Sequence, residues 1–163
     1  MSDSFFDINK LIPQVNSILK QKGYLFLEAK KRFNEVYLSV EGESIPSNCL
    51  PKADFAARSA NSLVFIEVDK DQGVSHNIAK YFYIIDRMEP KPTSVSVIHI
   101  LGPGFLASGN NYIFHRKLAG YIGDRIKEYF ANNLEFSYIQ SPVFSNNEDI
   151  LNWLKNNLSQ STN

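Results

Sequence analysis

The sequence has little of what marks several large protein classes. Cys49 is its single cysteine, which excludes an internal disulfide framework and fits a reducing compartment. No apolar run approaches the roughly 20 residues that a membrane-spanning helix needs. The N-terminus carries Asp3 and Asp7 where a secretory signal would have positive charge. We therefore expect a cytoplasmic protein that does not associate with membranes.

Net charge is also lacking, because 17 Lys and Arg residues balance 17 Asp and Glu residues, so the overall charge favours no class of partner. What is present is the composition of a folded chain: 44% of its 163 residues are hydrophobic and 13% are aromatic. No internal repeat or low-complexity segment divides it. The sequence thus predicts a single domain over residues 1–163.

Hydrophobic periodicity predicts helices alternating with strands. Pro13 places the start of the first helix near Ile12, with Gly23 as its stop. Residues 24–41 are ambiguous, because two strands (24–29 and 35–40) or a helix followed by one strand both fit. The remaining predicted strands are 52–58, 63–69, 94–101 and 136–140, and the remaining predicted helices are 75–88, 111–131 and 147–158.

The same pattern predicts which sides of the two central helices are buried. In helix 75–88 the expected buried residues are Ile78, Phe82 and Ile85. In helix 111–131 they are Phe114, Leu118, Tyr121, Ile122, Ile126 and Tyr129. The overall order predicts an α/β fold, with a mixed sheet covered by helices on both faces.

Acidic residues lie inside and next to the most apolar strand. Alternation places Glu67 and Asp69 on the same face as Phe65. If the preceding strand pairs with this one as a hairpin, Asp54 can point to the same place, although the sequence does not fix the register. Converging carboxylates would bind Mg²⁺ or Mn²⁺, and such an ion can promote phosphate hydrolysis. The alternative is a strand that ends in solvent with its charges hydrated.

An Asp at a strand start, a bend, and an apolar strand ending in Glu followed by a helix resemble the active-site pattern of PD-(D/E)XK nucleases, the restriction-endonuclease-like superfamily. The resemblance covers about residues 7–140, and the C-terminal helix 147–158 follows it. It implies a restriction-endonuclease-like fold that hydrolyses phosphodiester bonds in nucleic acid, with DNA expected. It also implies that Asp54 and Glu67 bind Mg²⁺ or Mn²⁺.

This chain departs from the pattern at the motif's lysine, where Asp69 stands. An acid cannot supply the missing positive charge. Lys80 on the following helix is the favoured replacement over Lys70, whose side chain should point to the opposite face of the strand. Asp69 would then assist; alternatively Asp69 is a third metal ligand, or the site is inactive. The other outcome is a catalytically inactive module of the same fold that binds nucleic acid or protein.

Basic residues outside this region are candidate phosphate contacts, because phosphates need cations without special geometry. They are Lys30, Lys31, Arg32, Arg116 and Lys127. Gly120 and Gly123 of helix 111–131 predict a close approach, by a nucleic-acid strand, by another helix or by a second subunit, so a homodimer or larger complex stays open. His99 is expected in the core and His115 at the surface.

Overall fold

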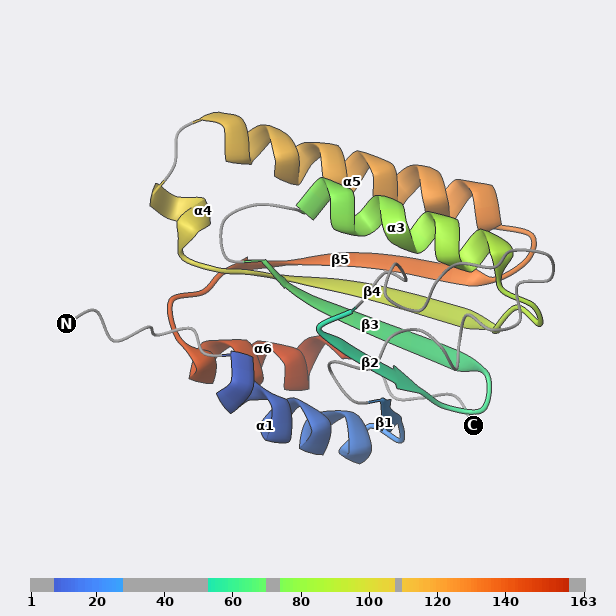
Figure 1. Cartoon of the computed structure of the whole chain (residues 1–163), viewed down its shortest axis with the longest axis horizontal. Coiled ribbons are helices and arrows are strands. Elements are labelled where there is room, and N and C mark those ends of the chain that lie inside the picture. The colour runs from blue at the N-terminus through green and yellow to red at the C-terminus, as the bar shows by residue number, and fades with distance from the viewer. Residues whose placement is uncertain (1–7, 28–52, 70–73, 108–109, 159–163) are drawn as a thin grey trace, which may run out of the picture.

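A mixed five-stranded sheet forms the middle layer of the molecule (Figure 1). The computed structural model describes residues 8–27, 53–69, 74–107 and 110–158. Its strands are β1 (Leu25–Leu27), β2 (Phe55–Arg58), β3 (Ser62–Asp69), β4 (Ser94–Leu101) and β5 (Glu135–Val143), in this spatial order. The β1–β2 and β2–β3 pairs are antiparallel, whereas β3–β4 and β4–β5 are parallel.

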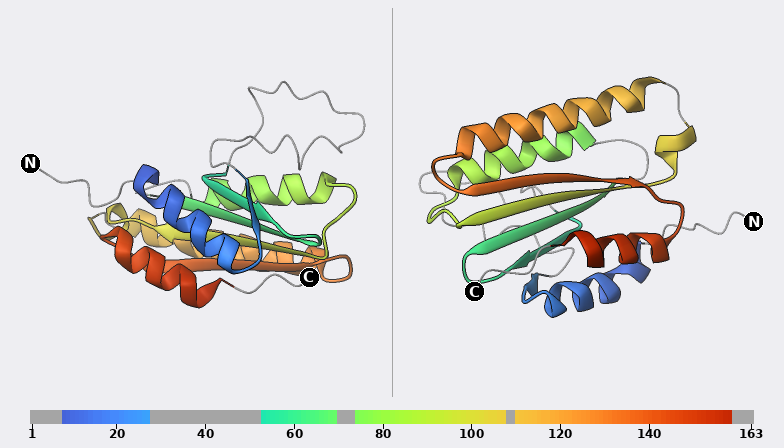
Figure 2. Two further views of the ribbon diagram at one scale, coloured as in Figure 1. Left: turned by 90° about the horizontal axis from the view of Figure 1, so that it is seen from below. Right: turned by 180° about the vertical axis from the view of Figure 1, so that it is seen from behind.

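Helices cover both faces of this sheet, as expected for the predicted α/β class. Helices α3 (Val74–Arg87) and α5 (Asn110–Phe130) lie side by side on one face. Helices α1 (Ile8–Gln21) and α6 (Asn147–Asn157) lie on the other, and the view from behind shows the same layers (Figure 2). The short helix α4 (Gly104–Ala107) follows β4. Among the described residues no helix is both long and apolar enough to cross a lipid bilayer.

The central strands are mostly apolar because both of their faces are buried. In β3, Phe65 packs among the residues under α3 and α5, whereas Val64 and Ile66 pack among those under α1 and α6. Parallel strands covered on two sides read as continuous apolar runs in a sequence. The predicted strand 94–101 therefore coincides with β4, and the predicted strand 63–69 lies within β3.

Two predicted boundaries are wrong. Helix α1 begins at Ile8 and continues through Pro13, because burial of Leu11, Val15 and Leu19 against the sheet outweighs the backbone hydrogen bond that proline cannot donate. Strand β5 continues past Gln140 to Val143 despite Pro142. There the register shifts, and the Leu101 backbone N–H donates to the Ser141 hydroxyl at 2.9 Å. The Ser141 hydroxyl thus accepts, next to Pro142, a hydrogen bond that a backbone carbonyl of the neighbouring strand would otherwise accept.

The predicted buried sides of α3 and α5 are also partly wrong. In α3, Phe82 is exposed and Tyr81 is fully buried instead. In α5, Phe114, Tyr121 and Tyr129 are each about 60% exposed. The side of α5 that meets the core carries Ala119, Gly123, Ile126 and Phe130. Small residues take the contact positions because α5 lies close against β5.

Several sequence predictions fall outside the described residues. These are the second strand of the ambiguous region (35–40), Cys49, Lys70 and the basic group Lys30, Lys31 and Arg32. Of that ambiguous region, the structure describes β1, which lies within the predicted strand 24–29.

Candidate functional site

Asp54 lies opposite Glu67 at the end of the β2–β3 ladder. The two strands pair Phe55 with Ile66 and Ala56 with Phe65, so the next pair in the register is Asp54 and Glu67. Asp54 precedes β2, and its Oδ2 accepts a hydrogen bond of 2.7 Å from the Val68 backbone N–H. The side chain of Asp54 thus continues the ladder where the backbone of β2 does not, which fixes the carboxylate beside β3.

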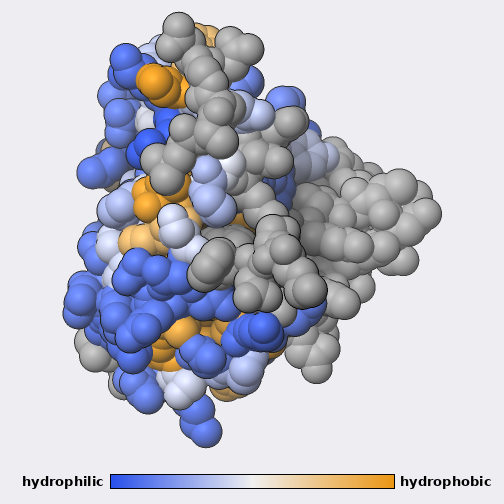
Figure 3. Space-filling model, turned by 90° about the vertical axis from the view of Figure 1, so that its left-hand side faces the viewer, coloured by the Kyte–Doolittle hydropathy of each residue, from blue (hydrophilic) through white to orange (hydrophobic). Residues whose placement is uncertain are grey.

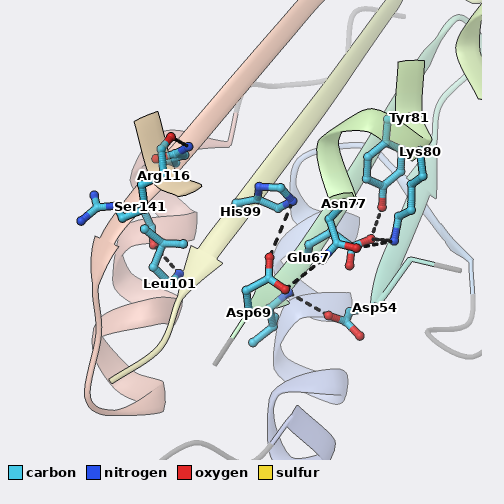
Figure 4. A network of polar contacts seen from close by, with 12 residues as sticks. Asp54, Glu67, Asp69, Asn77, Lys80, Tyr81, His99, Leu101, Arg116 and Ser141 are labelled. Atoms are coloured by element: carbon cyan, nitrogen blue, oxygen red, sulfur yellow. Dashed lines mark hydrogen bonds and ion pairs between the residues drawn. The ribbon is translucent and has the colours of Figure 1, made fainter. Parts of the chain in front are cut away.

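Glu67 is buried at this place and is held by two residues of α3 (Figure 4). The Lys80 ammonium lies 2.7 Å from Glu67 Oε1, and the Tyr81 hydroxyl donates to the same oxygen. Lys80 and Tyr81 reach Glu67 together because consecutive residues at this point of α3 both overlie the end of β3. Tyr81 also stacks on Phe65, with ring centroids 4.8 Å apart.

Burial raises the pKa of both carboxyl groups. The pKa of Glu67 rises to about 7 because desolvation outweighs the Lys80 charge and the hydrogen bonds from Lys80 and Tyr81. The pKa of Asp54 is raised by burial and is lowered in part by the Val68 N–H and Lys80. The negative charge of Asp54 further raises the pKa of Glu67. A cation next to these groups would stabilise the ionised form of each.

Asp69, where the resemblance would place a lysine, contacts α3 through a different residue. Its Oδ1 accepts a 2.8 Å hydrogen bond from Asn77 Nδ2. The Asn77 carbonyl oxygen in turn accepts from the Lys80 ammonium at 3.2 Å. The structure therefore brings Asp54, Glu67, Asp69 and Lys80, the four residues proposed from the sequence, to one end of the sheet (Figure 4).

His99 lies in the next strand, paired in register with Glu67, and is fully buried. Its Nδ1 is 2.7 Å from the Tyr138 hydroxyl, and its Nε2 is 3.9 Å from Asp69 Oδ2. Burial and the positive charge of Lys80 lower the pKa of His99 to about 3, so the ring is neutral at ordinary pH. The prediction that His99 is a core residue is borne out by its burial.

Asn77, Tyr81, Tyr138 and Gln140 belong to this polar group and were not predicted from the sequence. One signal for two of them existed: Asn77, Lys80 and Tyr81 are spaced i, i+3 and i+4, so they share one side of a helix. Nothing comparable marks Tyr138 and Gln140, which join the group because β5 pairs with β4.

The carboxylates can be tested as ligands of a divalent ion by their number and chemistry. Within the described ranges, no group of three or more His, Cys, Asp or Glu side chains is arranged to hold a metal ion. Mg²⁺ is nevertheless commonly held by one or two carboxylates together with water and substrate phosphates. Asp54 and Glu67 meet that requirement, and they present the hard oxygen ligands that Mg²⁺ and Mn²⁺ prefer.

The other predicted residues lie away from these carboxylates. The backbone carbonyl of Arg116 accepts a 2.9 Å hydrogen bond from Gln140, and Arg116 lines a hollow of about 330 Å³ with Ile113, Lys117 and Gln140. Lys127 is exposed on α5. Gly123 packs directly on Tyr138 of β5 and not on nucleic acid, another helix or a second subunit, whereas a Cβ atom added at Gly120 would meet nothing within 4 Å.

The end of the sheet where β3, β4 and β5 finish is the end that carries the carboxylates. Figure 3 looks toward this end, and its described surface is mainly hydrophilic with small apolar patches. Comparison of the chain with protein-family models, curated proteins and solved structures gave no match. The assignment of a function therefore depends on the geometry of the site.

Proposed function

We propose that this chain is a divergent PD-(D/E)XK-type domain that hydrolyses phosphodiester bonds in nucleic acid, with DNA as the expected substrate. The observation that carries the proposal is the 2.7 Å contact between Lys80 and Glu67. It places a cation from the helix after β3 beside the acid of the motif. A lysine that replaces the missing strand lysine would need to lie beside this acid.

Two features of the fold support the proposal. The chain runs from an N-terminal helix through antiparallel strands to a helix and a parallel strand, the order that the resemblance implies. The β2–β3 register sets Asp54 across from Glu67, so the two acids of the motif come from neighbouring strands. A strand that simply ran out into solvent would not bury Glu67 under two helical side chains.

In this proposal each residue has a separate task. Asp54 and Glu67 would hold Mg²⁺ or Mn²⁺, and the ion would supply positive charge at the scissile phosphate and the attacking water. The Lys80 ammonium, held beside Glu67, would supply positive charge to a phosphate oxygen or to the attacking water. Water adds to phosphorus and releases one proton to solvent, the bond to the leaving oxygen breaks, and that oxygen takes up a proton from solvent. Arg116, Lys127 and the segment with Lys30, Lys31 and Arg32 would contact the backbone phosphates.

The proposal is tested by nicking of supercoiled plasmid DNA in Mg²⁺ or Mn²⁺. We expect cleavage by the full chain and a loss of about 100-fold or more in Asp54→Asn, Glu67→Gln and Lys80→Met, because each removes a group that acts on the charge of the reacting phosphate. Asp124→Asn and Lys155→Met change exposed residues of α5 and α6 and serve as matched controls. All variants are purified in parallel to detect contaminating nucleases.

A second readout measures the ion without activity. Mn²⁺ should raise the melting temperature of the wild type, because a ligand that binds only the folded state stabilises it. The shift should be reduced in Asp54→Asn and Glu67→Gln. Absence of both cleavage and a metal-dependent shift would contradict the proposal. DNA binding without cleavage would indicate the inactive module, which the replacement of the motif lysine by Asp69 favours.

A further inference from the structure

Asn77 lies between an acid and a cation, and only one orientation of its amide satisfies both. Asp69 Oδ1 can only accept a hydrogen bond and faces Asn77 Nδ2 at 2.8 Å. The Lys80 ammonium can only donate and faces Asn77 Oδ1 at 3.2 Å. Turning the amide over would set oxygen against oxygen and nitrogen against nitrogen. Asp69 therefore determines which end of the Asn77 amide faces Lys80.

On its other side Asp69 faces His99, where a chain of hydrogen bonds that begins at α5 ends. The separation of His99 and Asp69 is longer than a hydrogen bond. Gln140 Nε2 donates to the Arg116 carbonyl and to the Tyr138 hydroxyl, each at 2.9 Å. The Tyr138 hydroxyl then has its own proton for His99 Nδ1, at 2.7 Å. This leaves the ring proton on His99 Nε2, which faces Asp69 Oδ2 at 3.9 Å. A lone pair in that place would repel the carboxylate, so both ends of the chain favour the same tautomer.

We propose that Asp69 and Asn77 are positioning residues: Asp69 orients the Asn77 amide, and the Asn77 carbonyl holds the Lys80 ammonium on Glu67. Asp69 is then neither a metal ligand nor a failed substitute for the motif lysine. Asp69 fixes Asn77 of α3, and Asn77 in turn orients Lys80. The kinetic part of this inference rests on the proposed function, whereas the geometric part does not.

Exchange of the two side chains tests the inference. Asn77→Asp alone sets two carboxylates against each other, so the side chain at position 77 should turn away from Asp69 and no longer hold the Lys80 ammonium on Glu67. In the double variant Asp69→Asn with Asn77→Asp, the new amide at position 69 donates to the new carboxylate at position 77, whose second oxygen accepts from Lys80. Asn156→Asp, on the exposed side of α6, is the control for an added charge.

The geometry is read by nuclear magnetic resonance of the lysine side-chain ¹⁵N–H groups, with Lys80 assigned by its loss in Lys80→Arg. A hydrogen-bonded ammonium exchanges its protons slowly, so its signal should be present in the wild type, lost in Asn77→Asp and restored in the double variant. Melting curves establish that each variant folds. If Asn77→Asp does not fold, Asn77→Ala is measured with the same expected loss.

The kinetic readout is cleavage of plasmid DNA. We expect kcat to fall about 100-fold in Asn77→Asp with little change in KM, because misplacing a reacting group by about 1 Å has an effect of this size. The double variant should recover most of that loss. An unchanged Lys80 signal in Asn77→Asp, or a double variant that restores neither signal nor rate, would overturn the inference. If the wild type cuts no DNA, the proposed function fails while the Lys80 signal still decides the positioning.

Discussion

Glu67 is the residue whose surroundings determine the behaviour of the site. It lies in a strand buried on both faces, yet it carries a group that is costly to bury in ionised form. Lys80 and Tyr81 offset part of that cost through direct contacts. The remainder appears as the pKa of about 7, so near neutral pH the carboxyl is divided between its two forms. The site thus retains a charge that a cation would stabilise.

This pKa has a consequence for stability that can be measured. In the unfolded chain Glu67 has its ordinary pKa of 4.5, and in the folded chain about 7. Between these values the folded state binds more protons, so the free energy of unfolding falls as pH rises through this window and levels off above it. The increase in the pKa of Glu67 on folding corresponds to a loss of about 3 kcal/mol in the free energy of unfolding across this window. Asp54, whose pKa is also raised, adds a slope of the same sign.

Urea unfolding at a series of pH values compares the wild type with Glu67→Gln. The variant should lose most of the decline between pH 4.5 and 7, because glutamine does not titrate. Glu135→Gln removes an exposed carboxylate at the start of β5 and should keep the wild-type decline. Equal slopes for the wild type and Glu67→Gln would contradict the prediction.

At this scale the sequence predicts the side chains that belong to one strand better than those that meet across strands. Alternation along β3 correctly predicted that Glu67 and Asp69 share the face of Phe65. The position of Asp54 opposite Glu67 required the β2–β3 register, which the sequence left open. Tyr138 joins the polar group because β5 pairs with β4 in parallel, in a register that sets Tyr138 beside Val97. Such contacts depend on register, and local patterns do not determine it.

Among the elements, α5 is the helix whose packing differs most from its sequence pattern. Large aromatic residues were assigned to its buried side, yet Phe114 and Tyr121 lie outward, and Gly123 lies against β5. Hydropathy favours large side chains for burial, but close packing of a helix on a strand requires small ones. The central strands were predicted well because turn residues bound their apolar runs. Helix α5 offered two possible sides, and hydropathy favoured the wrong one.

The two glycines of α5 should respond oppositely to alanine. A Cβ atom at Gly123 would lie 2.4 Å from Tyr138 Cδ1, whereas one at Gly120 would meet nothing within 4 Å. Gly120→Ala should therefore stabilise the protein by about 1 kcal/mol through helix propensity. Gly123→Ala should destabilise it by about 1–3 kcal/mol, because the aromatic ring has to move.

The two variants are compared by urea denaturation under identical conditions, each serving as the other's control. The sign of the difference is the test. Stabilisation by Gly123→Ala equal to that of Gly120→Ala would mean that Tyr138 yields without cost, and would contradict the close packing of α5 on β5.

For the molecule as a whole, one sheet separates two groups of buried side chains. One lies under α3 and α5 and includes Phe65, Val97 and Phe130. The other lies under α1 and α6 and includes Val64, Ile66 and Ile98. Because neighbouring residues of the same strands belong to opposite groups, neither can be lost without exposing the sheet. This arrangement favours the single domain expected from the sequence.

We accordingly expect one cooperative unfolding transition. Trp153, the single tryptophan, lies in α6 and packs against Phe144, so its fluorescence reports on one face of the sheet. Far-UV circular dichroism reports on all helices, and the longest, α5, covers the opposite face. The two signals should give the same urea midpoint, as two-state unfolding requires. Separate midpoints would show that the faces unfold independently.

The residues around Glu67 have a further consequence for the order in which the chain assembles. One stretch of sequence, from just before β2 to α3, contains an antiparallel hairpin and the helix after it, and it supplies Asp54, Val68, Lys80 and Tyr81. His99 and Tyr138 come from strands that are added by longer crossovers, and such pairings form more slowly than local ones. During synthesis the acids and Lys80 therefore emerge together, in contact with water. Lys80 and Tyr81, which cover Glu67, come from this same segment, so the contacts that offset its burial can form before β4 is added.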